Sequence, residues 1–221
     1  MDIKKLGNSA IIFTINRLIE VVAILIFFSG ILLFLSLISY SPTDPNFIFP
    51  ENTEIKNILG FQGSYTADLF FQSLGLIAYL VPITFIFTGI NIFRKKEIFL
   101  IIENTFFATL YSLVGSLFFG FYYESSFSFY INGNGGFIGL YLNETFLTNI
   151  FTSYENIFYY LFLLLITILF LKSLNFSLRG FLIFLRDTNQ FLFKKNKKNY
   201  TNENEIISEY IPQDEIKNLI Q

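Results

Sequence analysis

The sequence predicts an all-α integral membrane protein with four transmembrane helices. Hydrophobic residues make up 53% of its 221 residues and charged residues only 14%, which is far from an average soluble domain. Four apolar runs reach the roughly 20 residues that are needed to cross a hydrocarbon core of about 30 Å. Lys and Arg are segregated along the chain, and this segregation indicates how the runs are oriented. The predicted spans are residues 20–39, 69–93, 99–121 and 155–173.

The distribution of basic residues predicts that both termini lie in the cytoplasm. Of the 15 Lys and Arg residues, all but one precede the first span, fill the turn between the second and third spans, or follow Leu171. The segments 40–68 and 122–154 contain Lys56 and no other basic residue. Because Lys and Arg accumulate in cytoplasmic loops, these segments are predicted to be two outer, periplasmic loops, and residues 1–19 a cytoplasmic N-terminus.

The first span is predicted to be a retained anchor. Its apolar run is longer than that of a cleaved signal peptide, and no small-residue cleavage site follows it. Pro42, Pro45 and Pro50 come soon afterwards, and proline cannot continue a helix. The span is therefore expected to end before these prolines.

The approach to the second span contains signals for the start of a helix. Gly60 and Gly63 are interpreted as flexible entry residues, and Ser64 as a helix cap. Asp68 would then lie near the positive end of the helix dipole, where a carboxylate is favourable. No Asp, Glu, Lys or Arg lies near the middle of any predicted span, and this argues against a proton pump or transporter.

The third span carries small residues at every fourth position. Small side chains let a neighbouring helix approach closely, so the stripe predicts helix packing, either within the bundle or between copies of the chain. A chance spacing of small residues is the alternative. The stripe consists of Ala108, Ser112, Ser116 and Gly120.

The second outer loop contains the stretch NGNGGFIGL, residues 132–140. A glycine-rich phosphate loop normally follows a strand and opens a helix, but no strand-rich nucleotide domain surrounds this stretch, and the charge distribution places it outside the cytoplasm. Gly133, Gly135 and Gly136 are instead predicted to form a tight turn. A short helix at the outer interface is expected to follow, interrupted by Asn143 and Glu144.

Two interpretations are open for residues 176–198, which mix apolar and basic side chains. They could form a basic amphipathic juxtamembrane segment on the anionic inner leaflet, or they could extend the fourth span with a basic flank. Residues 199–221 are polar and acidic and are predicted to be a disordered linker.

The residue types exclude most catalytic chemistry. Without Cys or His the chain cannot provide thiolate nucleophiles, imidazole bases or the usual zinc ligands. It also lacks any Gly-Lys pair and therefore a Walker A loop. We predict no catalytic, cofactor-binding or metal-binding residues and no cofactor in this chain, and we expect no direct binding of nucleic acid. A membrane enzyme that uses outer-loop carboxylates is an alternative, and its candidates are Asp44, Asp68, Glu124 and Glu144.

Three stretches occur in an order that is typical of one family. They are LISYSPTDPNF after the first span, NILGFQGSYTADLFFQSLGLIAYLVP at the second, and NGNGGFIGLYL before the fourth. With them, residues 18–175 resemble the four-helix membrane domain at the N-terminus of the FtsK/SpoIIIE DNA translocases. Ser64 departs from the alanine that is common there. The positions that carry the resemblance, all expected to be structural, are Ser41, Pro42, Asp44, Pro45, Gly63, Ala67, Asp68, Gly75, Ala78, Tyr79, Pro82, Gly133, Gly135 and Gly136.

The resemblance implies a membrane anchor that acts at the division septum in the bacterial inner membrane. In such proteins this domain associates with itself and with membrane proteins of the divisome, and an attached ATPase motor moves chromosomal DNA. The chain carries no motor, so the motor would belong to the same or a neighbouring gene product. The chain would then be a fragment, a split-gene anchor or a truncated copy. The alternative is a small channel or transporter subunit with four transmembrane helices.

Overall fold

The computed structural model describes residues 3–45, 54–124, 131–145, 147–176 and 186. The chain divides into two compact units, residues 1–176 and 177–221. The elements described below belong to the first unit, and within the described ranges all of them are helices.

Four long apolar stretches of helix are long enough to cross a membrane. They are α1 (Ile3–Ile38), α2 (Gly60–Leu74) continued by α3 (Leu80–Lys95), α4 (Leu100–Tyr122) and α7 (Glu155–Ser173). By length and composition, the part of the chain that the structure describes offers four candidate spans: Ser9–Ile38, Gly60–Lys95, Leu100–Tyr122 and Glu155–Ser173. The prediction of an all-helical protein with four long apolar helices is confirmed.

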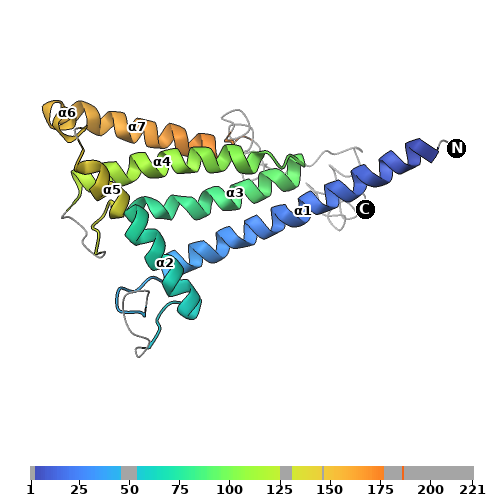
Figure 1. Ribbon diagram of the computed structural model, residues 1–221, viewed down its shortest axis with the longest axis horizontal. Coiled ribbons are helices and arrows are strands. Elements are labelled where there is room, and N and C mark those ends of the chain that lie inside the picture. The colour runs from blue at the N-terminus through green and yellow to red at the C-terminus, as the bar shows by residue number, and fades with distance from the viewer. Residues whose placement is uncertain (1–2, 46–53, 125–130, 146, 177–185, 187–221) are drawn as a thin grey trace, which may run out of the picture. The chain divides into compact units, whose positions relative to one another are not determined.

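α1, α3, α4 and α7 lie side by side in a row, and α2 runs at an angle to α3 toward the end of α1 (Figure 1). α1 packs along α3, α3 packs against α4, and α4 packs against α7, so that α1 and α7 form opposite edges. Large apolar side chains on these edges are exposed, including Leu25, which is 64% exposed, and Leu164, which is 60% exposed. Exposed apolar surface on this scale is expected of a protein whose surroundings are lipid.

The first unit has two chemically different ends. One end, which we call the loop end, contains residues 39–45, 54–59, 123–124, 131–145 and 147–154, including the short helices α5 (Gly136–Asn143) and α6 (Leu147–Ser153). The other, which we call the basic end, contains Arg17 and the α3–α4 turn with Arg94, Lys95 and Lys96. There Glu20 of α1 accepts hydrogen bonds from Arg17 and Lys96.

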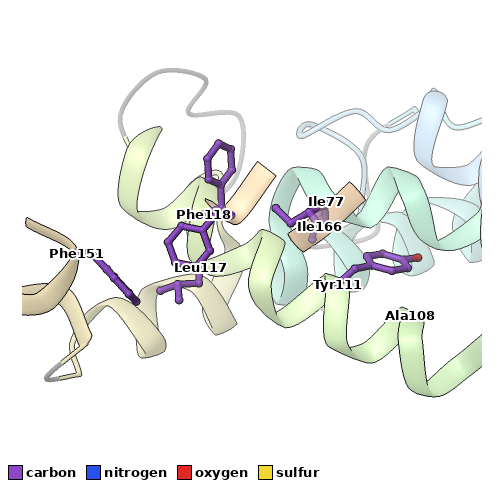
Figure 2. Close-up of a cluster of buried hydrophobic side chains, with 8 residues drawn as sticks. Ile77, Ala108, Tyr111, Leu117, Phe118, Phe151 and Ile166 are labelled. Atoms are coloured by element: carbon purple, nitrogen blue, oxygen red, sulfur yellow. The ribbon is translucent and has the colours of Figure 1, made fainter. Parts of the chain in front are cut away.

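Three buried clusters hold the described parts of the spans together; the smallest, Ala23, Ile92 and Leu100, joins α1, α3 and α4. The largest joins α4 to α7, α6 and the 3₁₀ turn η1 (Gly75–Tyr79). Figure 2 shows Leu117, Phe118 and Phe151 together toward one end of this cluster, and Ile77, Ile166 and Tyr111 toward the other. The second cluster joins α1 to α2 and α3, and consists of Leu33, Leu37, Ala67, Phe71, Ala78 and Val81.

The second span is interrupted, which the sequence analysis did not anticipate. The helix begins at Gly60 rather than near residue 69, and α2 ends at Gly75, where φ is +72° and ψ is −148°. This region of conformational space is essentially restricted to glycine. The chain then makes the turn η1 and resumes as α3. Pro82 lies in the first turn of α3, where its missing N–H costs nothing, but it could not continue a helix arriving from α2.

The fourth span ends at a well-defined cap. Asn175 has φ +51°; its N–H donates to the carbonyl of Lys172, while Phe176 N–H donates to the carbonyl of Leu171. These two bonds form a Schellman motif, which terminates a helix. α7 therefore ends at Ser173 with this cap, and both interpretations of residues 176–198 stay predictions. Apart from Phe176 and Arg186, that segment and residues 199–221 lie outside the described residues.

Polar side chains tie this cap to the neighbouring spans. Asn91 of α3 donates to the Leu174 carbonyl at 2.9 Å. The Asn175 amide donates to Asn104 of α4, which in turn donates to Thr88 of α3. One turn before Thr88 on α3, the hydroxyl of Thr84 lies 3.0 Å from the hydroxyl of Ser173. The end of α7 is thus held by hydrogen bonds to both α3 and α4.

Single cysteines would determine which side of the membrane each end faces. The chain contains no Cys, so each introduced thiol is the only one. Ile58→Cys and Ile131→Cys place a thiol on exposed positions of the loop end, and Glu97→Cys places one in the exposed α3–α4 turn. We expect a membrane-impermeant maleimide to label positions 58 and 131 from outside the cell, and position 97 only after lysis. The opposite pattern would reverse the predicted orientation.

Candidate functional site at the loop end of the spans

The first and second family stretches are joined by the carboxylate of Asp44. Asp44 is 1% exposed, and its two oxygens accept hydrogen bonds from the backbone N–H groups of Lys56 at 3.0 Å and Asn57 at 2.8 Å. A buried carboxylate is tolerated when such donors replace its hydration. Asp44 therefore fixes residues 54–57 against the end of the first span.

A second set of bonds holds the start of α2 against α1. The Asn57 amide donates to the Ser36 carbonyl at 2.9 Å, and the Ser36 hydroxyl donates to the Gly63 carbonyl at 2.6 Å. Ser64 donates its hydroxyl to the carbonyl of Pro45 at 2.7 Å. The interpretation of Ser64 as a helix cap is wrong, because α2 begins at Gly60 and both Gly63 and Ser64 lie inside it.

Asp68 lies in the third turn of α2, away from the helix start where it was expected to complement the dipole. It is 5% exposed and accepts hydrogen bonds from Tyr40 at 3.2 Å and Gln72 at 3.3 Å. Burial, together with the negative charge of Asp68, raises the pKa of the Tyr40 phenol well above its ordinary value. The phenol therefore stays protonated and keeps donating to the carboxylate.

Gln72 connects the second stretch to the third. Its side-chain oxygen accepts the backbone N–H of Asn132 at 3.2 Å, and its carbonyl accepts the Asn132 amide at 3.1 Å. Further along, Leu76 N–H donates to the Asn134 carbonyl at 2.9 Å. The side chain of Asn134 is fully buried and donates to the carbonyl of Tyr123. Asparagines of the loop thus satisfy backbone groups that the break at Gly75 frees.

Glycines allow three backbones to meet at this break. A Cβ on Gly75 would overlap the Asn134 carbonyl, and one on Gly136 would lie 2.6 Å from the Gly75 nitrogen. A Cβ on Gly135 would lie 2.5 Å from the Ser116 carbonyl oxygen of α4. The third stretch therefore packs between the bend of the second span and the last turns of α4.

The small-residue stripe of α4 faces this region and α3. Gly120 lies next to Gly139 of α5, and the Ser116 hydroxyl donates to the Leu74 carbonyl at 2.8 Å. Ala108 and Ser112 line an apolar hollow shared with α2 and α3. The short helix predicted before the fourth span consists of two helices, α5 and α6, and α5 packs against α4.

The remaining family positions differ in their surroundings. Ala67 and Ala78 are fully buried in the second cluster, and the ring of Tyr79 lies 5.0 Å from that of Phe71. The hydroxyls of Ser41 and Thr43 lie 2.9 Å apart, and Pro42 is exposed. The carbonyl of Gly133, which has φ +69°, accepts the N–H of Gly136 in a turn, and a Cβ on Gly133 would make only an ordinary contact, 3.7 Å from the Glu124 carbonyl oxygen.

The geometry fits a rigid surface rather than a reaction centre. We use the name loop assembly for residues 39–45, 54–79 and 131–143. Its two buried carboxylates, Asp44 and Asp68, are occupied by hydrogen bonds, and Glu124 and Glu144 are exposed. Within the described ranges, no three acidic residues come together in a way that could hold a metal ion. Aromatic pairs are presented outward, with the rings of Phe61 and Tyr65, and those of Phe137 and Tyr141, each 6.4 Å apart.

A match to a protein-family model shows to which family the chain belongs. Residues 16–183 match the model of the 4TM region of DNA translocase FtsK/SpoIIIE. The chain belongs to this family. The match corresponds to the FtsK membrane region alone and includes no motor domain. It covers most of the first candidate span, the whole of the other three and the whole loop assembly.

Curated relatives agree with the FtsK family. The chain is similar to DNA translocase FtsK of Rickettsia typhi, with 28% identity over 39% of this chain and 12% of the relative. It is also similar to the FtsK proteins of Rickettsia bellii, with 30% identity over 35% of the chain and 10% of the relative, and Pseudomonas putida, with 33% identity over 29% and 8%. The chain thus spans about an eighth or less of the curated relatives that it matches. No solved structure matches it.

Proposed function

We propose that the chain is the membrane anchor of an FtsK-like DNA translocase and directs it to the division machinery. The single observation that carries this proposal is the family match over residues 16–183, which includes every element of the loop assembly. Under this proposal the protein resides in the bacterial inner membrane and concentrates at the division septum. The motor would be supplied by the same or a neighbouring gene product, and this chain would have no enzymatic activity of its own.

The build of the loop assembly supports a role in protein contacts. Its polar groups are used to fix the backbone, as the two N–H donors on Asp44 illustrate. Many of its exposed side chains are large and apolar or aromatic, including Phe137 at 61% and Tyr141 at 64%. Aromatic residues held on rigid elements are favoured as contact residues in interfaces. The proposed partners are membrane proteins of the divisome and further copies of this chain.

A fluorescent fusion of the full chain in its host tests the proposal. We expect the fusion to concentrate at midcell in constricting cells. Tyr141→Ser, on exposed α5, is expected to reduce midcell enrichment at least about threefold, as loss of an interface anchor would, while membrane localisation is retained. The matched control is Tyr160→Ser on α7, because Tyr160 is 71% exposed but lies outside the loop assembly.

Uniform fluorescence around the membrane throughout constriction would contradict the proposal. Equal loss of enrichment by Tyr141→Ser and Tyr160→Ser would leave the anchor function but exclude the loop assembly as the targeting surface. Flux of ions or small solutes across vesicles reconstituted with the purified chain would instead support the channel alternative.

A further inference from the structure

An apolar groove runs between α1 and α3 near the basic end. Its volume is about 380 Å³, its accessible surface is apolar, and Arg94 is the one charged residue that lines it. Such a volume is within the range of about 300–1,000 Å³ that is typical of small-molecule sites. A groove without polar atoms cannot hold ordered water, because each water needs two or more polar partners. In a membrane it must therefore be filled by an apolar group.

The shape of the groove follows from residues on both helices. Gly89 lines it where the two backbones come closest, since an added Cβ would lie 2.7 Å from the Ala23 carbonyl oxygen and from Phe27. Phe28 and Phe93 line it further out and are 56% and 45% exposed. The groove is therefore narrow, built on a rigid contact, and open to the surroundings along its length.

The charged side chains at the Arg94 end of the groove, which we call the rim, indicate which kind of apolar molecule would bind there. Arg94 is exposed and lines the groove, and within the described part of the chain it makes no ion pair. Lys96, by contrast, is bound to Glu20 and lies over the Phe93 ring at 4.3 Å. Glu20 is thereby occupied by Lys96 and Arg17. Glu97 is the acidic residue of the α3–α4 turn, against the three basic residues Arg94, Lys95 and Lys96. The rim carries an excess positive charge that is centred on Arg94.

We propose that this groove binds an anionic phospholipid, with an acyl chain between α1 and α3 and the headgroup phosphate on Arg94. Apolar contact alone gives little preference inside a bilayer, because lipid chains outside the groove are equally apolar. Selectivity must then come from the headgroup, and basic pockets between transmembrane helices are known to bind anionic headgroups. The guanidinium group of arginine matches phosphate oxygens with paired hydrogen bonds. This inference is independent of the proposed division role.

Native mass spectrometry of the full chain in mild detergent tests the site. The protein is offered phosphatidylglycerol or phosphatidylethanolamine with identical acyl chains, so that only the headgroup differs. We expect the protein to retain about fivefold more phosphatidylglycerol than phosphatidylethanolamine. This ratio corresponds to the preference for an anionic lipid that one basic residue provides. Arg94→Gln should remove the preference. Lys95→Gln is the matched control, because Lys95 is exposed on the same turn but does not line the groove.

A second variant tests the groove separately from the charge. Ile90→Trp fills the groove from α3 and leaves Arg94 in place; we expect it to lower the retention of both lipids. Ile24→Trp fills the groove from α1, and it replaces Ile90→Trp in the experiment if that variant does not fold. Equal retention of phosphatidylglycerol by the native chain, Arg94→Gln and both folded groove variants would overturn the proposal. Efficient disulfide formation between copies carrying Ile90→Cys would also overturn it, because a second chain would then cover the groove.

Discussion

Gly75→Ala is expected to lower the thermal midpoint of the detergent-solubilised protein by about 6–12 °C, equivalent to about 3 kcal/mol for a chain of this size. The new Cβ would overlap the backbone carbonyl of Asn134, which has no flexible end to move aside. Moving the loop away would also break the Leu76–Asn134 hydrogen bond. The measurement is a thermal scan followed by size-exclusion chromatography with fluorescence detection.

Gly60→Ala is the matched control for Gly75→Ala. Gly60 has a similar positive φ, +67°, but an added Cβ meets nothing within 4 Å. The control therefore carries the cost of left-handed backbone without the collision, about 1 kcal/mol. Equal shifts for both variants would mean that the close approach at Gly75 contributes nothing to stability.

Asp44→Ala is expected to cost about 2–5 kcal/mol of unfolding free energy, because it leaves one buried and one partly buried N–H group without an acceptor. The affected donors are the amides of Lys56 and Asn57. Hydrogen exchange measured by mass spectrometry should show faster exchange at these two amides, and the thermal midpoint should fall.

Two further variants bracket the effect of Asp44→Ala. Asp44→Asn keeps one acceptor oxygen and places an NH₂ group against the other N–H, so its effect should be intermediate. Glu54→Ala changes an exposed carboxylate in the same segment and should leave both measurements unchanged. If Asp44→Ala behaved like Glu54→Ala, the carboxylate would not be what orders this segment.

The four apolar helices could be predicted because membrane thickness sets their length and composition directly. The break in the second span could not be predicted. Gly75 stands out in the sequence only as a family position, and its unusual φ and ψ accompany a contact with Asn134, which lies far away in the sequence. Pro82 is a local signal for the start of a helix, but from the sequence it is identified only as a family position.

The sequence motifs identify the family positions, but they do not identify the hydrogen-bond partners of these residues. Asp44 and Asp68 stood out as carboxylates in recognisable stretches, but nothing local indicated that Asp44 would bind backbone amides or that Tyr40 would donate to Asp68. Ser64 was misplaced because a serine before an apolar run usually caps a helix, whereas here the helix had already begun at Gly60. Asn57, Gln72 and Asn132 were overlooked, although amide side chains beside an apolar segment are a usable signal for bonds to loop backbone.

The cap at the end of α7 has a mechanical consequence. A pull on the chain beyond Phe176 reaches Leu174, which is bonded to Asn91 of α3, and Asn175, which is bonded to Asn104 of α4. The load is therefore shared across three helices before it can draw α7 out of its place. Tension applied there would load hydrogen bonds to two neighbouring helices, so this corner of the molecule resists a pull on α7.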